Sequence, residues 1–424
     1  YSGMIGSGVD YIQAVRVRDK YLDSRYWKQN VSYGEWNVKS NALSEVEALW
    51  DETSEEGLND VLSEFSSVLD ELAKEPESEE TRAVVLETAQ SLCSYMNNMS
   101  DSLTSLQNDY NTNVKVKVNE INSYAGQIRD LNKQIYKAEL NGSTANDLRD
   151  QRTLLVDKLT AIADVTVNEY TAGTLPNGEK DVRFQIVLDG VSLVNHFTFN
   201  ELECCTINDG SENDGMYGVR WAETGIDVEF EGGEIKGYLD LRDGTGEDGQ
   251  YKGIPYYMEQ LNTFAGTFAK AFNEGIYSDG NQHCEGHAGG AGSDGTTGTR
   301  FFSFDGKSTE ELMAIGADMD EIYSNITAAN ISITSDIEND TGLIAAASIS
   351  GESGNNENVT GLVALFSDSG VFSCGMPEDF VNSIVATLGV ATSHASRMYS
   401  NYENILNQID NKRTSVSGVS LDEE

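Results

Sequence analysis

The chain has 424 residues and a formal net charge of −42, from 70 acidic and 28 basic residues. An acidic surface repels phosphate backbones and anionic lipid, so we expect neither nucleic acid nor a membrane as a partner. No apolar run approaches the roughly 18 residues that a membrane-spanning helix needs. The five cysteines are an odd number without a Cys-x-x-Cys spacing, so they do not predict a disulfide framework.

The first part of the chain predicts helices. Residues 5–17 alternate in part between apolar and polar, which allows an extended start, and 16–47 favours a helix. A break is expected at 54–57. A short helix then covers 61–72 and ends at Glu75-Pro76, because the residue before a proline is biased away from helical geometry.

The longest regular feature of the sequence is an apolar stripe with steps of three or four residues. Its members are Leu92, Met96, Met99, Leu103, Leu106, Tyr110, Val114, Val118, Ile121, Tyr124, Ile128, Leu131 and Ile135. This spacing predicts one buried face of an α-helix over 79–140, with a cap at Asn141-Gly142 and a further helix through 148–162. At about 1.5 Å per residue the stripe alone would be roughly 65 Å long, too long for a compact globule.

A second apolar stripe lies near the other end of the chain. Its members are Phe380, Ile384, Leu388, Ala391, Ala395, Met398, Tyr402, Ile405 and Ile409. Each stripe needs something to bury against, and the other stripe is the obvious candidate. We therefore expect an elongated helical rod built from the N- and C-terminal parts, with the middle of the chain inserted in it.

Near Val165 the apolar period changes from 3.6 to 2. Strands are predicted at 165–167, 182–188, 218–221 and 227–230, separated by glycine turns. Further along, 255–272 favours a helix, 279–300 a Gly-rich loop and 328–333 a strand, and helices resume near Val359 and Pro377.

These patterns predict a mainly α fold with a β-rich insertion. The helical rod would be a discontinuous domain of residues 1–165, 252–278 and 334–424. Residues 166–251 would form the inserted β-rich lobe, and 279–333 a small insertion of loops and strands.

The residues that most resemble a metal site are His283, Cys284 and His287. Two imidazoles and a thiol could bind Zn²⁺, and Cys204-Cys205 could add thiolates if the loops meet. Against this, adjacent cysteines do not easily supply two tetrahedral ligands, and the segment lies in a Gly-rich loop. We expect no metal, no cofactor and no catalytic residues.

A predicted helix break is followed by a segment that contains Asn146, Asp147, Leu148, Arg149, Asp150 and Arg152. Its four charged residues, Asp147, Arg149, Asp150 and Arg152, alternate in sign. One interpretation is a charge-paired contact between subunits. The other is local pairing at i,i+3 together with helix capping. The sequence leaves both open.

The segment 146–152 resembles the flagellar hook-associated protein 1 family (FlgK), the first junction proteins between hook and filament. Further resemblances follow in order: Leu72-Ala-Lys-Glu-Pro76 with Arg82-Ala-Val-Val-Leu86, Gly232-Gly-Glu-Ile-Lys-Gly237, Phe301-Phe302, and the closing Arg413-Thr-Ser-Val-Ser-Gly-Val-Ser-Leu421-Asp422-Glu-Glu424. They favour this family over flagellin and the second junction protein. Because Phe302 and Ile331 are close in sequence, a second full-sized outer domain is not expected.

The resemblance implies a flagellin-like core and an extracellular structural protein, exported by the flagellar secretion apparatus and assembled as a ring between hook and filament. It implies hook protein, the second junction protein and further copies of the chain as partners. It also implies terminal axial helices beyond Tyr1 and Glu424. The helix beyond Glu424 would be bound by a flagellar export chaperone. Because the chain starts without Met and ends just after a helix signal, we expect it to be part of a longer protein. The alternative is a metal-dependent enzyme or glycan-binding module in the β-rich insertion.

Overall fold

The computed structural model describes residues 18–50, 57–140, 145–175, 178, 180–208, 210, 213–352 and 354–417. The extended start expected at 5–17, most of the break at 54–57 and the Asn141-Gly142 cap lie outside these residues.

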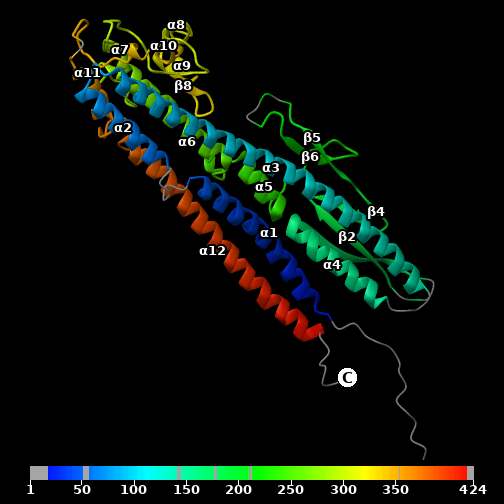
Figure 1. The fold of residues 1–424 in the computed structure, drawn as a ribbon. Helices are drawn as coiled ribbons and strands as arrows, with labels where there is room; N and C mark the ends of the chain where they lie inside the picture. Colours follow the sequence, from blue (N-terminus) through cyan, green and yellow to red (C-terminus); the bar gives the residue numbers. More distant parts are fainter. Residues whose placement is uncertain are drawn as a thin grey trace, which may run out of the picture. The chain divides into compact units, whose positions relative to one another are not determined.

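The long helices that carry the fold are α1 (Lys20–Leu49), α2 (Leu58–Lys74), α3 (Glu79–Leu140), α4 (Asn146–Ile162), α5 (Gly233–Asp243), α6 (Ile254–Glu274), α11 (Glu357–Leu365) and α12 (Pro377–Ser417) (Figure 1). Short helices are η1 (Glu247–Gly249), α7 (Gly286–Gly289), α8 (Thr309–Met313), α9 (Met319–Tyr323), α10 (Ser335–Asn339) and η2 (Thr341–Leu343). The strands are β1 (Val165–Thr174), β2 (Lys180–Leu188), β3 (Val191–Asn195), β4 (Thr198–Phe199), β5 (Leu202–Thr206), β6 (Tyr217–Trp221), β7 (Phe302–Phe304) and β8 (Ile331–Ile333).

The prediction of a mainly α fold with a β-rich insertion is confirmed. The long helix α3 has the bounds that its apolar stripe predicted, and α2, α4, α6, α11 and α12 lie where the sequence placed helices. Among the described residues, no helix is long and apolar enough to cross a membrane.

The strand prediction is right at β1, β2 and β6 and wrong at 227–230. There only Asp227 makes an isolated bridge, to Arg220, and the chain turns into α5 a few residues later. The strands β3, β4 and β5 were not predicted. They are two to five residues long, too short for a period of 2 to stand out.

The chain forms two compact units. Unit 1 comprises residues 1–38, 112–238 and 396–424, and unit 2 comprises 39–111 and 239–395. The boundaries fall inside α1, α3, α5 and α12, so each of these helices contributes residues to both units. The predicted scheme of a rod domain with two insertions stays a prediction.

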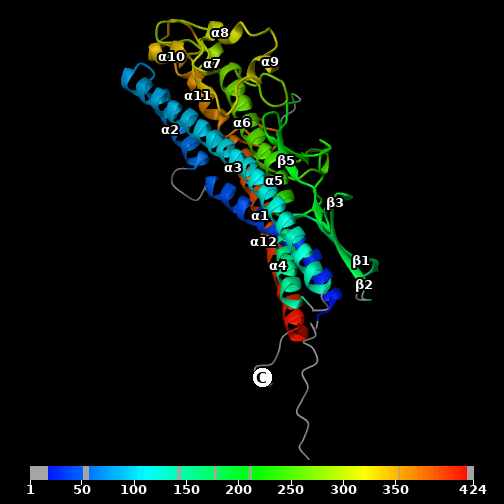
Figure 2. The same ribbon diagram turned by 90° about the vertical axis from the view of Figure 1, so that its right-hand side faces the viewer.

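Unit 1 places the four-stranded antiparallel sheet β1-β2-β3-β4 beside α3 and α4 (Figures 1 and 2). Asn122 holds the start of β5 on α3, because its amide donates to the Leu202 carbonyl and accepts from the Leu202 N–H. Further along α3, Asn132 donates to the carbonyl of His196 in the turn between β3 and β4. The four-stranded sheet and the β5-β6 pair are therefore each hydrogen-bonded to the long helix.

Unit 2 is built around aromatic side chains. The buried ring of Phe65 in α2 lies 5.6–6.0 Å from the rings of Phe272, Phe301, Phe302 and Phe366. Ring pairs at these spacings add specific contact energy to the burial of apolar area. The Phe301-Phe302 element noticed in the sequence is thus part of the core.

The C-terminal stripe on α12 meets partners other than the long helix α3. In unit 2, the Phe380 ring lies 4.7 Å from Phe372 and 6.0 Å from Phe264 of α6. In unit 1, Tyr399 lies 5.5 Å from Tyr33 of α1. Phe380 of the stripe, and Tyr399 next to stripe residue Met398, therefore pack against α6, Phe372 and α1. The sequence had suggested α3 as the partner of this helix.

We predict that Gly34→Ala in unit 1 destabilises the protein, because an added Cβ on α1 would collide with the backbone carbonyl of Ala161 in α4. The expected cost is about 2–4 kcal/mol, since two helices must separate. Thermal unfolding followed by circular dichroism measures it. Gly126→Ala is the matched control, because its nearest non-local neighbour would be a Phe199 ring atom at 3.9 Å. An equal loss in both variants would contradict the proposed close approach.

Candidate functional site

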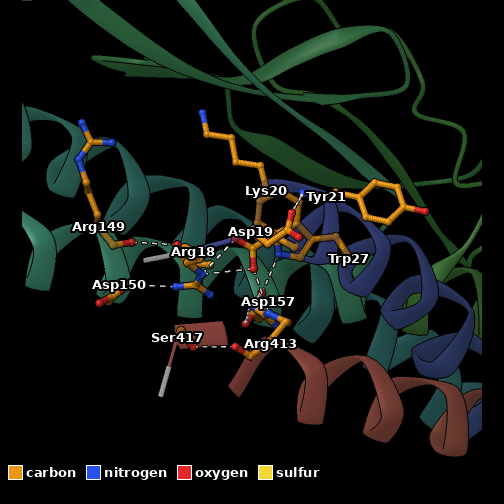
Figure 3. Close-up of polar contacts among 12 residues, drawn as sticks. Arg18, Asp19, Lys20, Tyr21, Trp27, Arg149, Asp150, Asp157, Arg413 and Ser417 are labelled. Carbon is orange, nitrogen blue, oxygen red and sulfur yellow. Dashed lines mark hydrogen bonds and ion pairs between the residues drawn. The ribbon is translucent and has the colours of Figure 1, made fainter. Parts of the chain in front are cut away.

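The C-terminal end of α12 is held by the guanidinium group of Arg413 (Figure 3). Its Nε lies 2.9 Å from Oδ1 of Asp23 in α1, and its Nη2 lies 3.0 Å from Oδ2 of Asp157 in α4. The group also lies over the ring of Tyr26, 4.2 Å from the centroid. The side chains of Arg413 and Asp23 are each only 9% exposed, so this is an ion network largely shielded from solvent.

The network continues to the start of α1. Arg18 Nε lies 3.0 Å from Oδ2 of Asp23, and Arg18 Nη1 donates to Oδ1 of Asp150 at 2.9 Å. Trp27 Nε1 donates to Oδ1 of Asp157 at 2.6 Å. Two guanidinium groups and three carboxylates thus join α1, α4 and α12 within unit 1.

Burial shapes the ionisation of this network. It raises the pKa of Asp157, an effect that Arg413 and the Trp27 hydrogen bond oppose. Burial alone would lower the pKa of Arg413, but Asp157 and Asp23 raise it overall. Each charge is therefore retained because its partner is present, and removing one partner leaves an uncompensated charge in a buried place.

The charged segment at the start of α4 makes contacts within the chain. Arg149 donates in a forked arrangement to both carboxylate oxygens of Glu139, near the end of α3, at 2.8 and 2.9 Å. Asp150 pairs with Arg18, as described above. Neither partner lies at an i,i+3 position, so these ion pairs join α4 to the end of α3 and to the residues just before α1.

Arg152 is the buried member of the segment. Its Nη1 donates to Asn132 Oδ1 at 2.9 Å, and its Nη2 donates to Glu169 Oε1 at 3.0 Å. Its guanidinium group also stacks over the Phe184 ring, 3.8 Å from the centroid. Arg152 thereby joins α4 to α3 and to strands β1 and β2.

The other predicted interaction residues are spread over this surface. Asp147 is exposed, Asn146 and Leu148 are half-buried, and Leu421 and Asp422 lie outside the described residues. A subunit contact at 146–152 stays a prediction. The sequence missed Asp23, Tyr26 and Trp27, whose i, i+3, i+4 spacing indicates one helix face but not its partner.

His287 is fully buried and both of its ring nitrogens are engaged. Nδ1 lies 2.8 Å from the Thr299 carbonyl, and Nε2 accepts from the Ala345 N–H at 2.9 Å. Burial lowers the pKa of His287 to about 4, so the ring is neutral in the fold near neutral pH. A metal at His287 would have to displace one of these hydrogen bonds.

The neighbouring side chains point to other partners. His283 lies 3.1 Å from Asp279 and stacks on the Tyr277 ring at 4.3 Å, while burial raises the pKa of the Cys284 thiol. Cys204 and Cys205 lie in β5, in unit 1. Within the described parts of the chain, no three His, Cys, Asp or Glu side chains are grouped to hold a metal.

Comparisons with known proteins give one consistent answer. The sequence model of a family described as "Flagellar hook-associated protein FlgK helical domain" matches residues 43–302. Flagellar hook-associated protein 1 of Bacillus subtilis is 32% identical over 442 residues, covering all of this chain and 81% of that protein. The Salmonella typhimurium protein of the same name is 26% identical, covering 71% of this chain and 50% of that protein.

A solved structure has the same fold. It is titled as the flagellar hook junction protein FlgK from Burkholderia pseudomallei, and it superposes with a TM-score of 0.72 at 14% sequence identity. The match covers 94% of this chain and 100% of that one.

We predict that Arg413→Met destabilises the protein by about 3–5 kcal/mol, because Asp23 and Asp157 lose their buried counter-ion. Urea unfolding measures the loss. Asp157→Asn combined with Arg413→Met should recover part of it, since one uncompensated carboxylate is removed. The control is Lys74→Met, which breaks an exposed pair with Asp70 and should leave the midpoint unchanged. If Arg413→Met and Lys74→Met shift the urea midpoint equally, the Arg413 network stabilises the protein no more than an exposed ion pair does.

We predict a loss of stability in acid that depends on His287. Its pKa is lowered in the fold from an ordinary 6.5 to about 4, so the unfolded chain binds more protons between these values. Stability therefore falls as pH drops through this window, with a contribution of about 2–3 kcal/mol. His287→Ala should lower stability at pH 7 and weaken this pH dependence, whereas His283→Ala should preserve it. Unfolding curves of each variant at pH 7 and 4.5 measure the change in the free energy of unfolding. An unaltered pH dependence in His287→Ala would contradict a buried neutral ring at this position.

Proposed function

The chain belongs to the family of flagellar hook-associated protein 1, FlgK, and we propose that it connects hook to filament by direct contact with subunits on both sides. It is a structural component of the hook–filament junction, located outside the cell on the flagellum and exported by the flagellar system. The observation that carries this assignment is the 32% identity that extends over the whole chain.

The arrangement of charges supports a structural role. The Arg413 network and Arg152 each join helices that are distant in sequence, and every group in them has a partner inside the chain. Such a network resists separation of α1, α4 and α12, which suits a connecting element. It offers no nucleophile with an adjacent base, the arrangement that covalent catalysis needs.

We propose three direct partners: hook protein, the second junction protein and further copies of this chain in a ring. A flagellar export chaperone would be a fourth partner before assembly. Exposed charges at the start of α4, such as Asp147, are candidates for subunit contacts. We propose no catalytic role, because the relatives are structural flagellar proteins and His287 has both ring nitrogens engaged.

A deletion strain of the source bacterium tests the function. Cells without the chain should assemble hooks that carry no filament and release filament protein into the medium, because the connecting element is missing. The wild-type chain should restore filaments. Arg413→Met should restore fewer at raised temperature, since its three helices are less firmly joined, and Lys74→Met should match the wild type. Electron microscopy and motility in soft agar measure the outcome. Normal filaments in the deletion strain would contradict a junction role.

A further inference from the structure

Strand β1 is a long outer strand of the sheet in unit 1. The sheet has the order β1-β2-β3-β4, and β1 has ten residues, whereas the other outer strand, β4, has two. Proteins usually shorten, charge or cover a long outer strand, because its unpaired backbone groups attract another strand. Residues 165–171 contain neither Pro nor Lys, and the pairing with β2 becomes irregular only between Thr171 and Gly173. This edge is therefore long enough to accept another strand.

The hydrogen bonds of β2 show which of its backbone groups face β1. The N–H of Phe184 donates to His196 Nδ1 at 3.3 Å, and the Phe184 carbonyl accepts from the His196 N–H at 2.9 Å. Both groups of Phe184 therefore point away from β1. Because backbone directions alternate along an antiparallel strand, the N–H and C=O groups of its neighbours Arg183 and Gln185 point toward β1.

The same alternation gives the directions in β1. Tyr170 lies opposite Arg183 and Asn168 lies opposite Gln185, so these two β1 residues pair with β2. The intervening residues of β1 direct their N–H and C=O groups outward. We name these groups, on Val167, Glu169 and Thr171, the open edge. Within the described part of the chain, no backbone hydrogen bond from another segment reaches the open edge.

The start of α1 is held beside β1. Lys20 forms an ion pair with Glu169, and the other carboxylate oxygen of Glu169 accepts from Arg152. Two residues earlier, Arg18 Nη1 lies 2.9 Å from Oδ1 of Asp150 in α4. These contacts fix the point at which the chain enters the described part of unit 1. The residues before Arg18 are therefore attached within reach of the open edge.

The directions of the neighbouring elements determine how those residues would run. Arg18 donates to Asp150 at the start of α4. Trp27 donates to Asp157 further along α4, so α1 and α4 run in the same direction. Strand β1 begins after the end of α4, and its Glu169 contacts the first half of α4, so β1 runs in the opposite direction. A segment that extends α1 backward is thus antiparallel to β1 and continues toward the far end of β1.

Residues 11–17 have the composition of a strand. Their sequence, Tyr-Ile-Gln-Ala-Val-Arg-Val, contains no Pro, Gly or acidic residue and is rich in β-branched and aromatic side chains. It carries one positive charge, which suits an edge that contains Glu169. At about 3.4 Å per residue, a strand of roughly five residues spans the distance from Glu169 to the end of β1. Residues 1–8, in contrast, include three glycines.

We propose that residues 11–17 bind the open edge as an additional antiparallel strand beside β1. The strand comes from the same chain, because Arg18 and Lys20 hold its end next to β1 and thereby give it a high effective concentration there. Its backbone supplies the donors and acceptors that the open edge lacks. The consequence is that the chain enters α1 along the sheet, in a fixed direction. This inference does not depend on the proposed junction role.

Hydrogen exchange of the 424-residue chain, measured by mass spectrometry, tests the pairing. Val15→Pro with Val17→Pro removes two backbone donors and disrupts the added strand. Exchange of the amides of Val167, Glu169 and Thr171 should then become at least about tenfold faster. The matched control is Gly3→Pro with Gly6→Pro, which should leave this exchange unchanged. Thermal unfolding checks that both variants stay folded. Equal exchange in the wild type and in Val15→Pro with Val17→Pro would overturn the proposal.

Photo-cross-linking identifies what covers the open edge. Benzoylphenylalanine replaces Val15 in one variant and Arg16 in another, because neighbouring side chains of a strand lie on opposite faces. At least one variant should give an adduct of single-chain mass, mapped to residues 165–188 and about tenfold stronger than from benzoylphenylalanine at Gly6. Thr171→Pro should weaken this adduct, since it removes an outward N–H and leaves the pairing with β2 in place. Adducts of twice the chain mass, or adducts only with other elements, would contradict the proposal.

Discussion

The rest of unit 1 depends on one buried ion network. Arg413 near the end of α12 has Asp23 and Asp157 as its two carboxylate partners, and these belong to helices that are separated from it by more than two hundred residues of chain. Burying a guanidinium group is unfavourable unless its partners are fixed in place. The same requirement fixes the helices, because a shift of α1, α4 or α12 would leave a buried charge without its partner. Arg152 imposes a similar requirement on α4, α3 and the sheet.

The helices were predictable and their partners were not. The stripe from Leu92 to Ile135 predicted a helix, because a single period is sustained over many turns, and α3 contains the whole stripe. The stripe says that a face is buried but not which element covers it, and α12 accordingly has contacts with α1, α4 and α6 that the sequence did not indicate. Short strands such as β4 carry too few residues for any period to be read.

The candidate site shows the same division. The sequence drew attention to Arg149, Arg152 and Arg413 through their resemblance to a family segment, and all three have paired carboxylates in the structure. The sequence could not identify Asp23 or Glu169 as their partners, because a single acidic residue does not stand out in a chain that has 70 of them. His287 looked like a ligand in sequence, and only the fold places Thr299 and Ala345 against its two nitrogens.

The proposed place of the chain in the hook–filament junction can be tested by seeing the fold there. An electron-microscopy reconstruction of the native hook–filament junction tests the account most directly. It should contain density for this fold between the last hook subunits and the filament, with Arg413 between α1 and α4. Absence of the fold from the junction, or an α12 that is separated there from α1 and α4, would contradict the account.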